Sequence, residues 1–166
     1  MMISFSLGPY QQNHEGENDI FYRLNHFTFN SLKTRVPANF PTYLEEVNLY
    51  QSIIAADMHI VCNRYNDLKN SDISEILFAM INRKPVVLLN FPIFAKDVNL
   101  FARDVIKNRL NKLLLCDITI FDRPDLQEFI RNATSQPINY MFTRHEEVLI
   151  RSRTRAHFRK LLSIGI

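Results

Sequence analysis

Glycine is scarce in this chain. Among its 166 residues, glycine occurs only at Gly8, Gly16 and Gly165. A dinucleotide-binding loop or a P-loop needs several closely spaced glycines, because the backbone must approach phosphate groups closely. Neither loop can be built from these three positions. Classical NAD binding and P-loop ATP hydrolysis are therefore not expected, and we expect no cofactor.

Cysteines and long apolar runs are also few. Cys62 and Cys116 each lie inside an apolar run, without the paired spacing of a zinc site or a disulfide framework. We therefore expect buried thiols in a reducing compartment and no metal site. No run reaches the roughly 18 apolar residues typical of a membrane helix, and the N-terminus lacks the basic segment of a signal peptide. These absences predict a cytoplasmic protein without a membrane partner.

Excess charge of one sign is small. The 20 basic and 17 acidic residues leave a net charge of +3, which by itself does not indicate a nucleic-acid partner. Basic residues do concentrate in residues 141–166, where Arg151, Arg153 and Arg155 alternate with other residues. Two interpretations of this segment stay open. We expect a solvated helix face whose apolar side packs on the body or on a second subunit, and therefore no nucleic-acid partner; the alternative is a helix that binds nucleic acid.

What the chain does have is an alternation of strand-like apolar runs and helix-like stretches, with 46% hydrophobic residues in all. Expected strands cover residues 3–7, 33–38, 58–62, 85–89 and 113–121, and expected helices cover 18–32, 43–56, 72–80, 97–110 and 124–133. This alternation predicts an α/β fold with a Rossmann-like (flavodoxin-like) parallel sheet of about five strands and helices on both faces. Residues 1–140 are expected to form this domain, and residues 141–166 a basic C-terminal helical extension of it.

Ligands of such sheets bind beyond the carboxyl ends of the strands. The rule points to residues 8–10, 63–74 and 90–99. Glu75 follows the second of these segments, in the early turns of a predicted helix, where the helix N-terminus favours an ionised carboxylate. Such a carboxylate can attack a sugar carbon, as in retaining glycosidases. The alternative is that Glu75 is an ordinary polar residue in the first turns of the helix, without a role in catalysis.

The residues around Glu75 form a longer pattern. Asp57 leads a strand, and after a loop come Ser71-Asp72-Ile73-Ser74-Glu75-Ile76-Leu77-Phe78-Ala79 and then Lys84-Pro85-Val86 with another strand. This segment resembles the central motif of the nucleoside 2-deoxyribosyltransferase family and its nucleotide N-glycosidase relatives. In that family a helix of the form small-x-x-x-Glu-(Ile/Leu)-x-x-Ala precedes Lys-Pro-Val and a strand.

Two further stretches fit the same family. Phe5-Ser6-Leu7-Gly8-Pro9 is similar to its first strand and Gly-Pro turn. Lys96-Asp97-Val98-Asn99-Leu100 looks like its segment with an active-site Asn. The three stretches occur in the family's order, so the resemblance covers roughly residues 3 to 120.

The resemblance implies a double displacement on a (deoxy)nucleoside or nucleotide. Glu75 would attack C1′, the base would leave, and another base or water would collect the sugar. Asn99 would position the carboxylate or a sugar hydroxyl, and a neighbouring subunit could supply it, because family members are oligomers. We therefore expect a homo-oligomer. The residues expected to border the substrate are Phe5, Gly8, Pro9, Tyr10, Asn63, Lys69 and Ser71.

The chain departs from the family at one important position. Family transferases carry an Asp six residues before the nucleophile, and this chain has Lys69 there. Asp72 is the best substitute for moving the proton of the leaving base, ahead of Asp67. Lys69 and Arg64 favour a nucleoside monophosphate as substrate, unless both are solvated loop cations. The alternative function is a non-catalytic nucleotide-binding or signalling module on the same fold.

Overall fold

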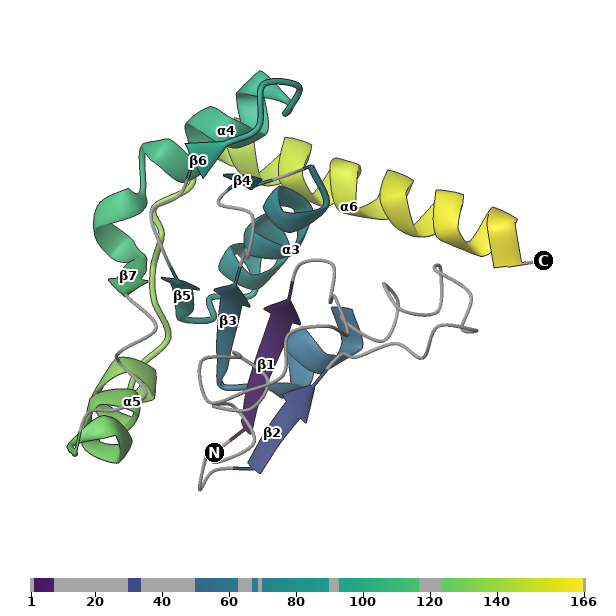
Figure 1. Cartoon of the computed structure of the whole chain (residues 1–166). Coiled ribbons are helices and arrows are strands. Elements are labelled where there is room, and N and C mark those ends of the chain that lie inside the picture. The colour runs from purple at the N-terminus through teal and green to yellow at the C-terminus, as the bar shows by residue number, and fades with distance from the viewer. Residues whose placement is uncertain are drawn as a thin grey trace.

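The structure is a computed structural model of the chain (Figure 1). It describes residues 2–7, 30–33, 50–62, 67–68, 70–89, 93–116 and 124–165. Residues 50–55 are helical. The other elements, in chain order, are β1 (Met2–Leu7), β2 (Asn30–Lys33), β3 (Met58–Cys62), β4 (Asp67–Leu68), α3 (Asn70–Ile81), β5 (Val86–Leu89), β6 (Ile93–Phe94), α4 (Leu100–Lys107), the 3-10 helix η1 (Leu110–Lys112), β7 (Leu114–Cys116), α5 (Leu126–Thr134) and α6 (Arg144–Gly165).

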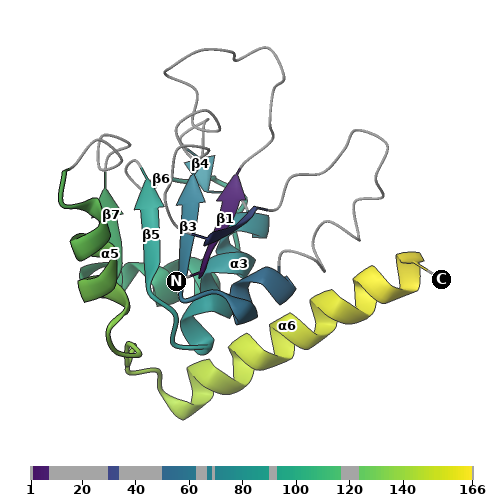
Figure 2. The ribbon, with the colours of Figure 1, turned by 90° about the horizontal axis from the view of Figure 1, so that it is seen from below.

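The main sheet is open and parallel, with the strand order β2-β1-β3-β5-β7 (Figures 1 and 2). In its register Leu7 lies opposite Cys62, Cys62 opposite Leu89, and Leu89 opposite Cys116. The carboxyl ends of β1, β3, β5 and β7 therefore lie along one edge of the sheet. This arrangement confirms the predicted α/β class with an open parallel sheet.

Both faces of the central strands are buried. Val61, Val86 and Leu88 belong to the hydrophobic cluster around α3, and all are at most 2% exposed. Successive side chains of a strand point to opposite faces, so Ile60 and Val87 point to the other face, where they are also buried. A continuous run of β-branched and apolar residues fits a strand that is covered on both sides.

Helix α3 is the most deeply buried helix that the structure describes. It packs against β3 and β5 and also against α4 and α6. Ile73, Ile76, Ala79 and Met80 have no measurable exposure. A helix that is apolar on almost every side must be enclosed by other elements. Helix α6 supplies part of that enclosure, because its Ile150 is buried in the same cluster as α3.

Several element boundaries differ from the sequence prediction, those of β2, α4 and α5 among them. Asn30–Lys33 form β2 and not the end of a helix, while residues 34–38, the rest of the predicted strand, lie outside the described residues. Asn-Ser-Leu-Lys has little intrinsic preference, so pairing with β1 decides its conformation. Helix α4 begins only after Asn99, which caps it. Helix α5 begins at Leu126, with Asp125 at its N-cap position, so Pro124 lies before the helix.

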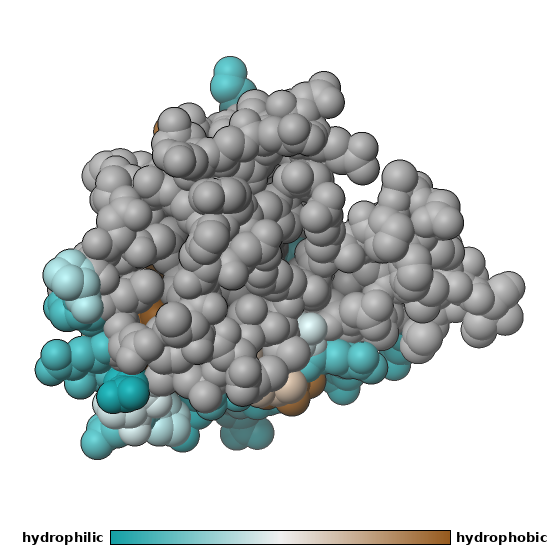
Figure 3. Space-filling model, turned by 60° about the horizontal axis from the view of Figure 1, so that its bottom comes forward, coloured by the Kyte–Doolittle hydropathy of each residue, from teal (hydrophilic) through white to brown (hydrophobic). Residues whose placement is uncertain are grey.

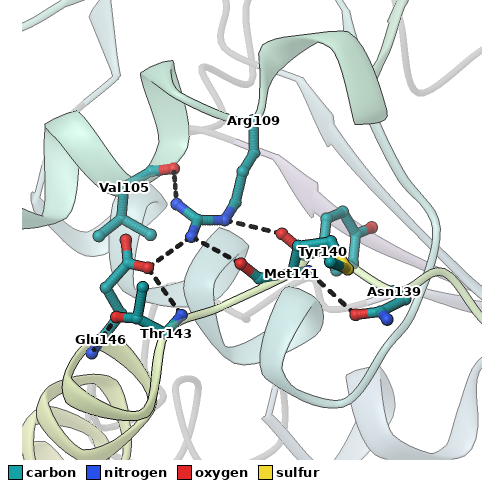
Figure 4. A network of polar contacts seen from close by, with 7 residues as sticks. All are labelled: Val105, Arg109, Asn139, Tyr140, Met141, Thr143 and Glu146. Carbon is teal, nitrogen blue, oxygen red and sulfur yellow. Dashed lines mark hydrogen bonds and ion pairs between the residues drawn. The ribbon is translucent and has the colours of Figure 1, made fainter.

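A buried arginine joins the end of α4 to the start of α6 (Figure 4). The guanidinium of Arg109 donates to the carbonyls of Tyr140 at 2.9 Å, Val105 at 3.0 Å and Met141 at 3.3 Å. It also pairs with Oε1 of Glu146 at 2.6 Å. Burying these charges is costly, and the full set of hydrogen bonds offsets that cost.

Glu146 also starts α6. Its Oε1 accepts from the backbone N–H of Thr143 at 2.9 Å, and its own backbone N–H donates to Oγ1 of Thr143 at 3.1 Å. This reciprocal pair is a capping box, which satisfies backbone donors that a helix N-terminus leaves open. Burial raises the pKa of Glu146, but the hydrogen bonds from Arg109 and Thr143 and the charge of Arg109 outweigh it and lower the pKa.

Replacement of Glu146 by Gln should lower the free energy of unfolding by about 2–4 kcal/mol near neutral pH, because it leaves Arg109 charged without its carboxylate. Since the folded state lowers the pKa of Glu146 below its ordinary value of 4.5, the stabilisation is complete above that pH and is lost as pH falls through the folded-state pKa. Urea unfolding of both proteins between neutral and acid pH measures this. If the two proteins differ in free energy of unfolding by the same amount at every pH, the lowered pKa of Glu146 is not the source of the stabilisation.

At the end of α3 a residue other than glycine adopts a left-handed backbone conformation. Arg83 has φ of 60°, in the left-handed region that glycine usually occupies after a helix. Its backbone N–H donates to the carbonyl of Met80, and that of Lys84 to Ala79. The carbonyl of Arg83 accepts from Ile138, which joins the turn to the segment before α6.

Replacement of Arg83 by Gly should raise the free energy of unfolding by about 0.5–1 kcal/mol, because glycine has no Cβ clash at positive φ, although it loses more entropy on folding. Replacement by Ala removes the exposed side chain but keeps the Cβ, and should give no gain. Thermal and urea unfolding of the three proteins distinguish the two effects. Equal stability of the Gly and Ala variants would show that the backbone conformation is not the cause.

Candidate functional site

The carboxyl edge of the sheet is where the predicted site falls. Strand β1 lies between β2 and β3. The next strand in the chain, β2, therefore lies on one side of β1, and the later strands lie on its other side, so the strand order reverses at β1. Ligands of open parallel sheets bind outside the strand ends at such a reversal. Residues Gly8, Pro9, Tyr10, Asn63 and Lys69 follow these strands in the sequence and lie outside the described residues.

Two other predicted residues are placed by their backbone alone. Phe5 lies in β1, opposite Ile60 of β3, two residues before the end of the strand. Ser71 lies in the first turn of α3. Their proposed contacts to a substrate stay predictions.

Glu75 and Asp72 are both buried, each with 8% exposure. They are three residues apart in the first two turns of α3, so they lie on one side of the helix. Carboxylates are rarely buried among apolar residues, because desolvation disfavours the charged form. Free backbone N–H groups at the helix start favour negative charge there. The burial of Glu75 does not fit a side chain that lies on a solvated helix surface.

The segments before α3 and α4 are held together by their backbones. Asp67 and Leu68 of β4 pair in parallel with Ile93 and Phe94 of β6. The carbonyl of Leu68 also accepts from the backbone N–H of Ala95 at 2.9 Å. Strands β4 and β6, which follow β3 and β5 in the chain, therefore lie side by side.

The side chain of Asn70 continues this connection. Its Nδ2 donates to the carbonyl of Asp97 at 3.2 Å, and its Oδ1 accepts from the backbone N–H of Asn99 at 3.0 Å. Oδ1 of Asn99 in turn accepts from the backbone N–H of Ala102 at 3.0 Å and caps α4. Asn70 therefore joins the start of the helix that carries Glu75 to the segment that carries Asn99.

Helix α6 also reaches the start of α3. Nη2 of Arg153 donates to Oγ of Ser74 at 3.2 Å, and Oγ of Ser74 donates to the carbonyl of Asn70 at 2.9 Å. Burial lowers the pKa of Arg153, and Tyr50 acts in the opposite direction. The guanidinium stays charged, since arginine is not deprotonated in proteins.

The sequence motifs did not identify this connection. They single out neither Asn70 nor a contact between Ser74 and Arg153. The four-residue spacing of Asn70 and Ser74 is a signal that could have indicated their contact. Arg153 is 79 residues from Ser74, and no local pattern predicts that pairing.

Among the described residues no group of three His, Cys, Asp or Glu side chains could hold a metal ion. None of the described helices is long and apolar enough to cross a membrane.

Replacement of Asn70 by Ala should lower the free energy of unfolding by about 1–2 kcal/mol, because two hydrogen bonds between the starts of α3 and α4 are lost. Replacement of Asn82 by Ala is the control. The Asn82 side chain donates to Phe78 within its own turn, so it joins no second element. Hydrogen exchange should show faster opening of the Ala102 amide in the Asn70 variant alone. Unchanged exchange there would mean that Asn70 does not hold the α4 segment.

Comparison of the chain with protein-family models, with curated proteins and with solved structures finds no match. The family resemblance therefore rests on the sequence motifs alone.

Proposed function

We propose that the chain transfers or hydrolyses N-glycosyl groups of (deoxy)nucleosides or nucleotides through a covalent ester on Glu75. The observation that carries this proposal is the burial of Glu75 in the early turns of α3, next to the ligand-binding edge of a parallel sheet. The strand order β2-β1-β3-β5-β7 supports a Rossmann-like, flavodoxin-type sheet, in which ligands occupy that edge.

The reaction has two displacements. In the first, a carboxylate oxygen of Glu75 bonds to C1′ while the N-glycosidic bond breaks, and its electron pair leaves with the base. Asp72, in its protonated form, gives the departing base a proton. In the second, water or an acceptor base attacks C1′, the ester bond breaks, and Glu75 regains its carboxylate. Asp72 takes up the proton that the incoming nucleophile releases.

Asn99 supports this chemistry from the α4 segment. Because its Oδ1 caps α4, a ligand would meet its Nδ2 amide, which can donate to a carboxylate or a sugar hydroxyl. Asn70 supports its placement near the start of α3 in the same chain. Lys69, directly before Asn70, would bind a 5′-phosphate, which favours a nucleotide substrate.

Incubation of the protein with a panel of nucleosides and nucleoside monophosphates, with and without a free acceptor base, should release free base, detected by chromatography. Replacement of Glu75 by Gln should reduce the release by about 1000-fold or more, because an amide cannot form the ester. The control is Glu128 to Gln, which changes an exposed carboxylate of α5. Mass spectrometry of the acid-quenched wild type should detect the glycosyl adduct on the peptide with Glu75.

Two results would overturn the proposal. One is no base release from any substrate by the wild-type protein. The other is equal release by the Glu75 variant. Nucleotide binding without base release would support the non-catalytic binding module instead.

A further inference from the structure

One side of α6 is rich in exposed arginines. The helix has 22 residues and is therefore about 33 Å long. Its inner side packs on α3 through Ile150 and Arg153. Four exposed arginines lie on the outer side, and we call them the arginine stripe: Arg144, Arg151, Arg155 and Arg159.

The spacing of the four residues places them in one row. Arg151, Arg155 and Arg159 follow each other at intervals of four residues, and Arg144 precedes them by seven. Residues four and seven apart lie on the same side of an α-helix. Arg151, Arg155 and Arg159 are therefore about 6 Å apart along the axis, and Arg144 lies about 10.5 Å before Arg151.

Little negative charge compensates the stripe. Arg151 pairs with Glu147 at 3.1 Å, and both side chains are about half exposed. From Val148 onward the sequence has no acidic residue. Among the residues that the structure describes, none forms an ion pair with Arg155 or Arg159. Like charges four residues apart on a helix destabilise it, so a polyanion over this side would remove a repulsion that the isolated chain retains.

The charge is also unevenly distributed over the molecule. Residues 148–166 contain five basic residues and no acidic ones, a charge of +5, whereas the whole chain carries only +3. All the other residues together therefore carry −2. Such an asymmetry orients the end of α6 toward an anionic partner during association.

We propose that the arginine stripe of α6 binds the phosphate backbone of nucleic acid, without base specificity. Arginine is the cation best suited to phosphate, because its planar guanidinium makes paired hydrogen bonds. Each strand presents one phosphate per about 3.4 Å of duplex axis, so each arginine of the row can meet one. Ser152 and Ala156, exposed beside the stripe, are small and allow a close approach.

The packing of α6 favours nucleic acid over a membrane surface as the partner. A helix that lies in a membrane interface buries an apolar side in the lipid. On α6, Ile150 is instead buried against α3, and the exposed apolar residues among its described side chains are Val148, Leu149 and the small Ala156, beside a row of four arginines. On the side of the molecule seen in Figure 3, the described surface is mostly hydrophilic and its hydrophobic patches are small. This proposal does not depend on the proposed reaction at Glu75.

The test measures the binding of fluorescently labelled single-stranded and duplex DNA by anisotropy, from about 50 to 200 mM salt. The double variant Arg155→Gln/Arg159→Gln removes two exposed cations of the stripe. The control, Lys96→Gln/Arg131→Gln, removes two exposed cations outside α6 and lowers the net charge equally. Circular dichroism and thermal unfolding verify that each protein is folded, and the two single variants replace the double variant if it is not.

The expected result is weaker binding by the α6 double variant, about 10-fold or more at low salt, with less than about threefold loss in the control. The slope of log K against log salt for duplex DNA should decrease by about 1.8 in magnitude, because two phosphate contacts are lost. Three results would overturn the proposal: no DNA binding by the wild type, equal losses in both double variants, or binding to anionic phosphatidylserine vesicles without binding to DNA.

Discussion

The enclosure of α3 is the constraint on which the rest of the structure depends. This helix packs on β3 and β5 and is covered by α4 and α6, so nearly all of its side chains are removed from water. Burial of so much apolar surface is the main favourable contribution to folding. It also removes the carboxylates of Asp72 and Glu75 from most contact with water.

Polar contacts at the two ends of the molecule then fix how the covering helices meet α3. At the sheet edge, Asn70 links the starts of α3 and α4 through both atoms of its amide. At the other side, Arg109 and Glu146 hold the end of α4 to the start of α6. Directional hydrogen bonds add geometric precision that apolar packing alone does not give. Two separate sets of polar contacts thus position the segment before α4 and the start of α6.

Helix α6 has two sides with different roles. Its inner side completes the core through Ile150 and contacts the start of α3 through Arg153. Its outer side exposes Arg144, Arg151, Arg155 and Arg159. A helix needs only one side for packing, so the other side is available for a partner. The same helix can therefore stabilise the domain and present charge to a polyanion.

The sequence by itself determined the α/β class, the central strands and the helix that carries Glu75, because continuous apolar strands and helical periodicity are local signals. It also singled out Asp72, Glu75 and Asn99 as candidates through their motif. Tertiary structure decided that Asn30–Lys33 pair as a strand, that Asn70 joins α3 to α4, and that Arg153 reaches Ser74. These contacts join residues far apart in the chain, and no local propensity encodes them, since only the fold of the whole chain brings the partners together.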